Sequence, residues 1–144
     1  MHPWKRGNSI LHIELRRWAD ILVVAPLSAN TLAKVTGGFS DNLLTSVVRA
    51  WDTTGLVEGS NEGRRKRILV APAMNTAMWR HPITKRQVRV LEEEWGIKEG
   101  DEQGEGWFEV LRPMEKELAC GDVGDGAMKD WKEIVKVIEA RLEL

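Results

Sequence analysis

The chain has 144 residues, which suits one domain, and its 21 basic and 22 acidic residues leave a formal net charge of -1. This balance gives no overall field that would favour nucleic acid or an anionic membrane. The apolar runs are far shorter than the ~20 residues of a membrane-spanning helix. Cys120 is the single cysteine, so an internal disulfide is excluded and a reducing, cytoplasmic setting is expected.

A short helical pattern at residues 11–18 leads into an apolar run at residues 21–26. A second such run occupies residues 68–72, and both contain the pair Ala-Pro at their ends. Neither run alternates polar with apolar residues, which is typical of strands buried on both faces of a parallel sheet. A weaker third strand is predicted at residues 107–111.

Apolar residues at helical spacing fill the segments between these strands. Helices are predicted at about residues 28–39, 41–51, 76–95 and 129–142. The third of these contains Pro82 near its start, and the last carries an apolar stripe that includes Trp131 and Val135, which we predict to be core. Residues 53–67 and 98–106 are rich in Gly and Glu and are predicted to be polar loops.

The alternation of strands and helices predicts an α/β fold, with a parallel sheet and helices on both of its faces. A doubly wound domain usually begins with a strand and a phosphate-binding turn, and we find no glycine-rich phosphate loop in this sequence. We therefore expect residues 1–144 to form a single domain whose N-terminal strands are missing.

Two similar turns follow the two apolar strands. The first reads Ala-Pro-Leu-Ser-Ala-Asn (25–30) and the second reads Ala-Pro-Ala-Met-Asn (71–75). Ligands of open parallel sheets bind beyond the carboxyl ends of the strands, and an asparagine offers both a donor and an acceptor. The alternative is that Asn30 and Asn75 only cap the helices that follow. The repetition of the turn favours a ligand site.

Two further residues could carry chemistry. Cys120 lies in a glycine-rich segment, residues 118–128, that would suit a loop closing on a substrate, although a lone cysteine is more often a buried apolar residue. His12 shares a helix face with Leu15 and Arg16, which is more often a structural placement. No spacing of histidines and cysteines is typical of zinc, so no metal site is expected.

Five motifs occur in an order that resembles one family. They are His-Ile-Glu-Leu-Arg-Arg-Trp-Ala-Asp (12–20), Ala-Pro-Leu-Ser-Ala-Asn-Thr (25–31), Asp-Asn-Leu-Leu-Thr (41–45), Ala-Pro-Ala-Met-Asn with Met78-Trp79 (71–79), and Leu-Ala-Cys-Gly-Asp with Gly-Ala-Met (118–128). Together they resemble the phosphopantothenoylcysteine decarboxylases, which are flavin-containing cysteine decarboxylases and include the plant and fungal halotolerance proteins.

This resemblance implies a flavodoxin-like, Rossmann-type fold that binds FMN at the interface of a homotrimer, or of a mixed trimer with homologous subunits. It implies the decarboxylation of 4′-phosphopantothenoylcysteine to 4′-phosphopantetheine in coenzyme A biosynthesis. The small-molecule substrate is then the expected ligand, with no nucleic acid and no membrane as partner.

The resemblance also implies a role for each matching residue. His12 would be the active-site base, and Cys120 would be the acid that protonates the ene-thiolate intermediate. Substrate contacts would be made by Asn75, which holds the carboxylate, Met78 and Ala119. Flavin contacts would be made by Ser28, Ala29, Asn30, Thr31 and Ala73.

Two other functions are kept as alternatives. One is a regulatory subunit of the kind found in fungal halotolerance and phosphatase-inhibitor complexes. The other is a fragment that is inert alone. The presence of both His12 and Cys120 favours the enzyme over a purely regulatory role.

Overall fold

The computed structural model describes residues 3, 5–57, 65–98, 104–117 and 123–144 of the chain. Its elements follow in the order α1 (Leu11–Trp18), β1 (Leu22–Leu27), α2 (Ala29–Gly37), α3 (Leu43–Arg49), β2 (Ile68–Pro72), α4 (Thr76–Arg80), α5 (Pro82–Arg89), the π-helical turn η2 (Val90–Glu94), β3 (Phe108–Val110), β4 (Met114–Glu117), β5 (Val123–Ala127) and α6 (Trp131–Leu142).

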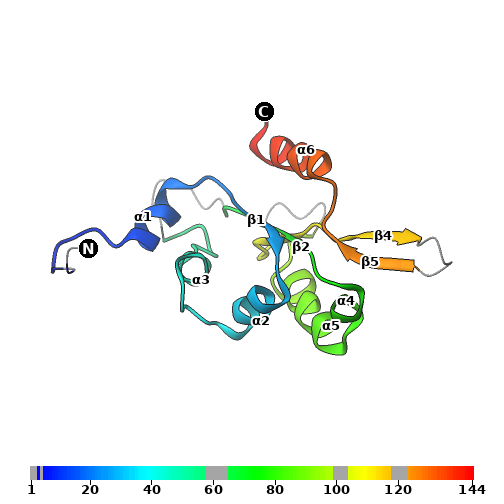
Figure 1. Cartoon of the computed structure of the whole chain (residues 1–144). Helices are drawn as coiled ribbons and strands as arrows, with labels where there is room; N and C mark the ends of the chain where they lie inside the picture. Colours follow the sequence, from blue (N-terminus) through cyan, green and yellow to red (C-terminus); the bar gives the residue numbers. More distant parts are fainter. Residues whose placement is uncertain (1–2, 4, 58–64, 99–103, 118–122) are drawn as a thin grey trace.

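The centre of the fold is a three-stranded parallel sheet in the order β1-β2-β3 (Figure 1). β2 is buried along its whole length, as its uninterrupted apolar run predicts. In the register of the sheet, residues 22–24 lie opposite residues 68–70, and Leu27 lies opposite Pro72 after a local irregularity. The carboxyl ends of β1 and β2 are therefore neighbours, and the predicted parallel α/β sheet is confirmed.

Two apolar clusters cover the two faces of this sheet. The larger cluster joins side chains of β1, β2 and β3 to side chains of α2, α3, α5 and η2, with Leu32 and Leu91 fully buried in it. The smaller cluster joins Leu69 and Ala71 of β2 to Ile134 of α6. Helices thus pack on both faces of the sheet. Within the described part of the chain, no helix is both long and apolar enough to cross a membrane.

The helix predicted at residues 76–95 is divided in the structure. α4 ends at Arg80, and His81 has an extended backbone (φ -61°, ψ 139°) before Pro82 opens α5. A residue that precedes proline is disfavoured in the helical conformation, whereas proline itself fits the first position of a helix. The prediction of one continuous helix through Pro82 is therefore wrong.

The antiparallel hairpin of β4 and β5 was not predicted from the sequence. Its second strand falls in the segment that we interpreted as a glycine-rich loop, because glycine is a poor strand former. The hairpin is attached to the turn after β2: the backbone N–H of Met74 donates to the carbonyl oxygen of Gly126 (2.9 Å), and the Thr76 hydroxyl donates to that of Asp125 (2.9 Å). Figure 1 shows the hairpin extending beside α4.

The prediction of a fully buried stripe on the last helix is wrong in part. Ile134 is buried at 5% exposure, but Trp131 and Val135 are 63% and 39% exposed. α6 contacts the sheet along a narrow face, so only part of its apolar surface is covered. Of the two predicted polar loops, the structure describes residues 53–57, 65–67, 98 and 104–106, and these residues form no helix or strand.

Candidate functional site at the carboxyl edge of the sheet

The two strand-end turns lie side by side. The backbone N–H of Ala73 donates to the carbonyl oxygen of Leu27 (3.0 Å), which joins the second turn directly to the first. Ser28, Ala29 and Ala73 present small side chains here, so a flat ligand can approach the backbone closely. This is the edge at which open parallel sheets bind ligands.

The two asparagines differ in what they do for the helices. Ser28, not Asn30, is the N-cap of α2, since its hydroxyl accepts a hydrogen bond from the backbone N–H of Thr31 (3.1 Å). Asn30 is exposed, and its amide makes no hydrogen bond within the described part of the chain. Asn75 does cap α4, because its Oδ1 accepts from the N–H of Met78 (2.9 Å). The capping alternative thus holds for Asn75 and fails for Asn30.

The residues at these turns fit the ring of the FMN that the resemblance implies. A flavin ring has carbonyl oxygens and a ring N–H on its polar edge, which need donors and acceptors, and the free Asn30 amide offers both. The small side chains of Ala29 and Ala73 leave space for a planar group. Among the described residues, no cluster of His, Cys, Asp and Glu could hold a metal ion.

α4 places two of the predicted substrate residues together. Asn75 is its N-cap and Met78 lies three positions later, so their side chains are neighbours on one helix face. Met78 is 43% exposed. α4 is held against α5 by Thr84, whose hydroxyl donates a hydrogen bond to the carbonyl oxygen of Met78.

Cys120 and Ala119 lie outside the described residues, in the connection between β4 and β5. The base of that hairpin is held against α4 by an ion pair between Arg80 Nε and Asp125 Oδ2 (2.6 Å). The Asp125 side chain is only 9% exposed, and its second oxygen, Oδ1, is buried without a hydrogen-bond partner in the described part of the chain. β5, the strand that follows Cys120 in the sequence, therefore lies beside α4, the helix of Asn75 and Met78.

His12 is not brought to this site within one chain. It is half-buried on α1, which packs against α3, and Figure 1 shows α1 at the opposite side of the molecule from α4. α1 is firmly attached there, because Lys66 Nζ donates to the carbonyl oxygens of Arg16 (3.1 Å) and Arg17 (3.0 Å) at its last turn. Within one chain, His12 on α1 therefore does not lie near Asn75 and Met78 on α4.

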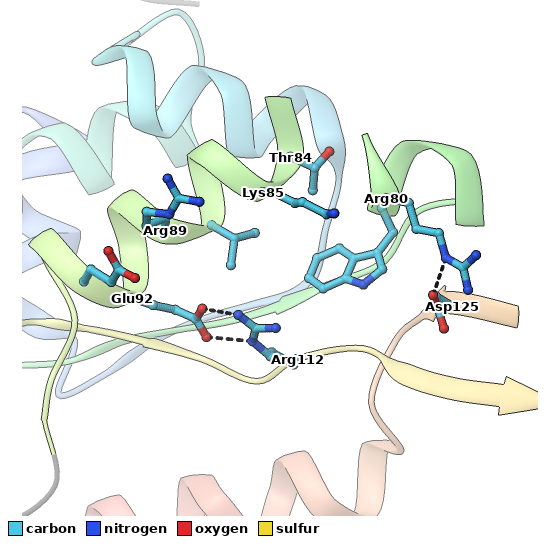
Figure 2. Close-up of a pocket in the computed structure, with 10 residues that line it drawn as sticks. Arg80, Thr84, Lys85, Arg89, Glu92, Arg112 and Asp125 are labelled. Carbon is cyan, nitrogen blue, oxygen red and sulfur yellow. Dashed lines mark hydrogen bonds and ion pairs between the residues drawn. The ribbon is translucent and has the colours of Figure 1, made fainter. Parts of the chain in front are cut away.

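A cavity of about 570 Å³, which we did not predict, adjoins α4 between α5, β5 and the segment that links β3 to β4 (Figure 2). Its lining includes Lys85 and Arg89 of α5, whose spacing of four residues was visible in the sequence as a basic helix face. It also includes Arg112, whose hydrogen bonds with the Glu92 carboxylate raise its pKa above the ordinary value. No local pattern could predict the contact of Arg112 with Glu92 of η2, because the two residues lie twenty positions apart in the sequence.

Comparison with known proteins places this chain in a defined family. The chain belongs to the Flavoprotein family, whose model matches residues 2–143. It is 50% identical over 126 residues to a probable phosphopantothenoylcysteine decarboxylase of Arabidopsis thaliana, covering 88% of this chain and 51% of that protein. It is 44% identical over 135 residues to Coenzyme A biosynthesis protein 3 of Saccharomyces cerevisiae, covering 94% of this chain and 20% of that protein.

Two solved structures share the fold. One is a PPC decarboxylase mutant complexed with pantothenoylaminoethenethiol, with a TM-score of 0.74 and 44% identity over 97% of this chain and 64% of that chain. The other is the FMN binding protein AtHal3, with a TM-score of 0.73 and 47% identity over 96% of this chain and 63% of that chain. The resemblance to phosphopantothenoylcysteine decarboxylases is therefore confirmed, and the chain spans about half the length of the plant relative.

Proposed function

We propose that this chain forms the catalytic part of an FMN-dependent phosphopantothenoylcysteine decarboxylase of coenzyme A biosynthesis, acting in the cytoplasm. The observation that carries the proposal is the joining of the two turns by the Ala73–Leu27 hydrogen bond, which sets the free Asn30 amide and the Asn75 helix cap on one edge of the sheet. The similarity to plant decarboxylases supports the choice of substrate.

Ser28, Ala29, Asn30, Thr31 and Ala73 are the residues that would hold FMN. When bound, FMN supplies the oxidation of the substrate thiol and the later reduction of the decarboxylated product. The Ser28–Thr31 hydrogen bond fixes the start of α2. The Asn30 amide, in the first turn of that helix, can then be directed at the ring without having to break a contact.

Asn75 is suited to hold the substrate carboxylate. Its Oδ1 is already engaged by the N–H of Met78, so only the Nδ2 donor group is free. A carboxylate accepts hydrogen bonds and donates none, and it therefore matches that remaining group. Met78 gives the same ligand an apolar neighbour.

The proton transfers would belong to His12 and Cys120. Histidine changes charge near neutral pH and can take a proton during oxidation of the thiol. A cysteine thiol, with an ordinary pKa of about 8.5, is a far better acid than a hydroxyl and can protonate the ene-thiolate that remains after carbon dioxide leaves. Replacing each of these residues should therefore stop the reaction at a different stage.

The stalling points test this assignment. The Cys120→Ser variant should release carbon dioxide and accumulate an oxidised ene-thiol, because the final protonation fails. The His12→Asn variant should release none. Absence of carbon dioxide release from Cys120→Ser, with FMN still bound, would argue against an acid that acts after decarboxylation.

We further propose that the site is shared between subunits of a homotrimer, or of a mixed trimer with homologous subunits. The separation of α1 from α4 supports this, because His12 of one chain can serve Asn75 only of another. Mixing His12→Asn with Cys120→Ser subunits should restore part of the turnover in hybrid assemblies. Mixtures as inactive as both parents, after exchange of subunits has been verified by mass, would refute the sharing.

A further inference from the structure

The cavity beside α4 has charged groups that are already paired and charged groups that are not. Figure 2 shows the two pairs: Arg112 contacts Glu92 through two hydrogen bonds (2.9 and 2.5 Å), and Arg80 contacts Asp125 (2.6 Å). In each pair the charges balance, and the guanidinium is held in place by its carboxylate. These pairs define the walls of the pocket and contribute little net charge to it.

Lys85 and Arg89 are the cations that remain. They stand four residues apart on α5, so they share one face of the helix, and both line the pocket. Neither side chain has a hydrogen bond or ion pair in the described part of the chain. Glu93, one turn beyond Arg89, is the one lining carboxylate outside the two pairs. Two unpaired cations therefore outweigh one carboxylate along this side of the cavity.

The same pocket has an apolar wall. Trp79 of α4 is half-buried, and Val88 of α5 is 4% exposed. A cavity of about 570 Å³ falls within the size range of sites for small organic ligands, which is about 300–1,000 Å³. An indole, an aliphatic side chain and two free cations together suit a ligand with an apolar portion and a strongly anionic group.

We propose that this pocket, the α5 pocket, binds the phosphate-bearing end of the substrate, an inference that rests on the proposed function. Lys85 and Arg89 would contact the phosphate, and Trp79 and Val88 would contact the branched aliphatic part of the pantothenoyl group. A phosphate monoester carries nearly two negative charges at neutral pH. Two cations therefore match its charge better than they would match the single charge of a carboxylate ligand.

The position of the α5 pocket relative to Asn75 supports this division of the substrate. Trp79 lies four residues after Asn75, so the two side chains lie on the same side of α4, and Trp79 lines the pocket. The cysteine end and the phosphate end of 4′-phosphopantothenoylcysteine lie at opposite ends of a long flexible chain. α4 would thus contribute Asn75 to the contacts of the cysteine end and Trp79 to those of the pantothenoyl group, while Lys85 and Arg89 of α5 would contact the phosphate.

Calorimetric titration with 4′-phosphopantothenate and with pantothenate tests the inference without requiring turnover. We expect the phosphorylated ligand to bind at least about tenfold more tightly, since two charge-assisted contacts are gained. The double variant Lys85→Gln with Arg89→Gln should remove this preference. Arg86→Gln is the matched control, because Arg86 is an exposed cation on the same helix that does not line the pocket.

Three outcomes would overturn the inference. They are failure of the wild-type chain to bind 4′-phosphopantothenate, equal affinity for the two ligands, and a preference that survives in the double variant. Two parallel titrations test whether the pocket binds a different phosphate-bearing ligand. Weakened FMN binding in the double variant would assign the pocket to the cofactor. Binding of inorganic pyrophosphate as tight as that of 4′-phosphopantothenate would make it a general anion site. Absence of carbon dioxide release despite the expected binding would count against the proposed function alone.

Discussion

Replacing Gly126 by alanine should detach the β4–β5 hairpin from the turn that follows β2. Gly126 has a φ of 100°, and its carbonyl oxygen accepts the hydrogen bond from Met74. A Cβ atom at this position would lie 2.1 Å from the carbonyl oxygen of Met74, a separation that the two backbones cannot keep. Either β5 or the turn that contains Met74 has to move.

The expected loss of stability has two parts. A left-handed backbone costs a non-glycine residue about 1–2 kcal/mol, and forcing a methyl group into a filled space costs about 1–3 kcal/mol more. Gly126→Ala should therefore lower the free energy of unfolding by roughly 2–5 kcal/mol. Urea unfolding followed by tryptophan fluorescence measures this change.

Gly38→Ala is the matched control. Gly38 ends α2 with a φ of 76°, but the nearest atom to an added Cβ is Arg49 Nε at 3.8 Å, which is an ordinary contact. This variant should lose only the backbone part, about 1–2 kcal/mol. Equal losses for Gly38→Ala and Gly126→Ala would refute the claim that contact with Met74 fixes the hairpin.

Three other changes test separate parts of the structure. Asn42→Ala removes the capping box that Asn42 forms with the buried Thr45 at the start of α3, and it should lower the free energy of unfolding by about 1 kcal/mol in the same urea assay; an unchanged value would contradict the importance of the cap. Asn75→Ser keeps a good N-cap but removes the amide, so thermal stability should stay near that of the wild type while affinity for the substrate falls; a large drop in melting temperature would mean that the amide is chiefly structural. The hydrogen bond from Lys34 lowers the pKa of Asp41 below its ordinary 3.8, so this pair stabilises the fold above that pH, and the stabilisation is lost as the pH falls through the lowered pKa. The difference in unfolding free energy between the wild type and Asp41→Asn should accordingly shrink in acid. A difference that grows in acid would contradict the lowered pKa of Asp41.

The sheet could be predicted from the sequence because its signal is local. The apolar runs at residues 21–26 and 68–72 contain enough β-branched side chains to indicate buried strands, and parallel pairing then places their ends together. The break in the helix before Pro82 could also have been predicted from the sequence, since the residue before a proline resists the helical conformation. The β4–β5 hairpin was not predictable in this way, because its second strand contains glycines and is held by contacts with Met74 and Thr76, far away in the sequence.

The candidate site was predictable to a different extent for different residues. The two turns were found from their repeated sequence, but only the structure distinguishes Asn75, which caps a helix, from Asn30, which does not. The position of His12 away from α4 depends on tertiary packing and could not be predicted from the sequence alone. The α5 pocket depends on Asp125, which pairs with Arg80 of α4, and on Arg112, which pairs with Glu92 of η2, and both contacts join distant segments.

Carbon dioxide release from 4′-phosphopantothenoylcysteine, measured while FMN is titrated into the chain, tests the central claim most directly. Flavin occupancy is measured by the fluorescence of the bound cofactor. The expected result is carbon dioxide release that rises with this occupancy and reaches a plateau when binding is saturated. His12→Asn should bind FMN and release nothing. Release that does not depend on FMN, or no release by the wild-type chain once FMN binding is saturated, would contradict the account.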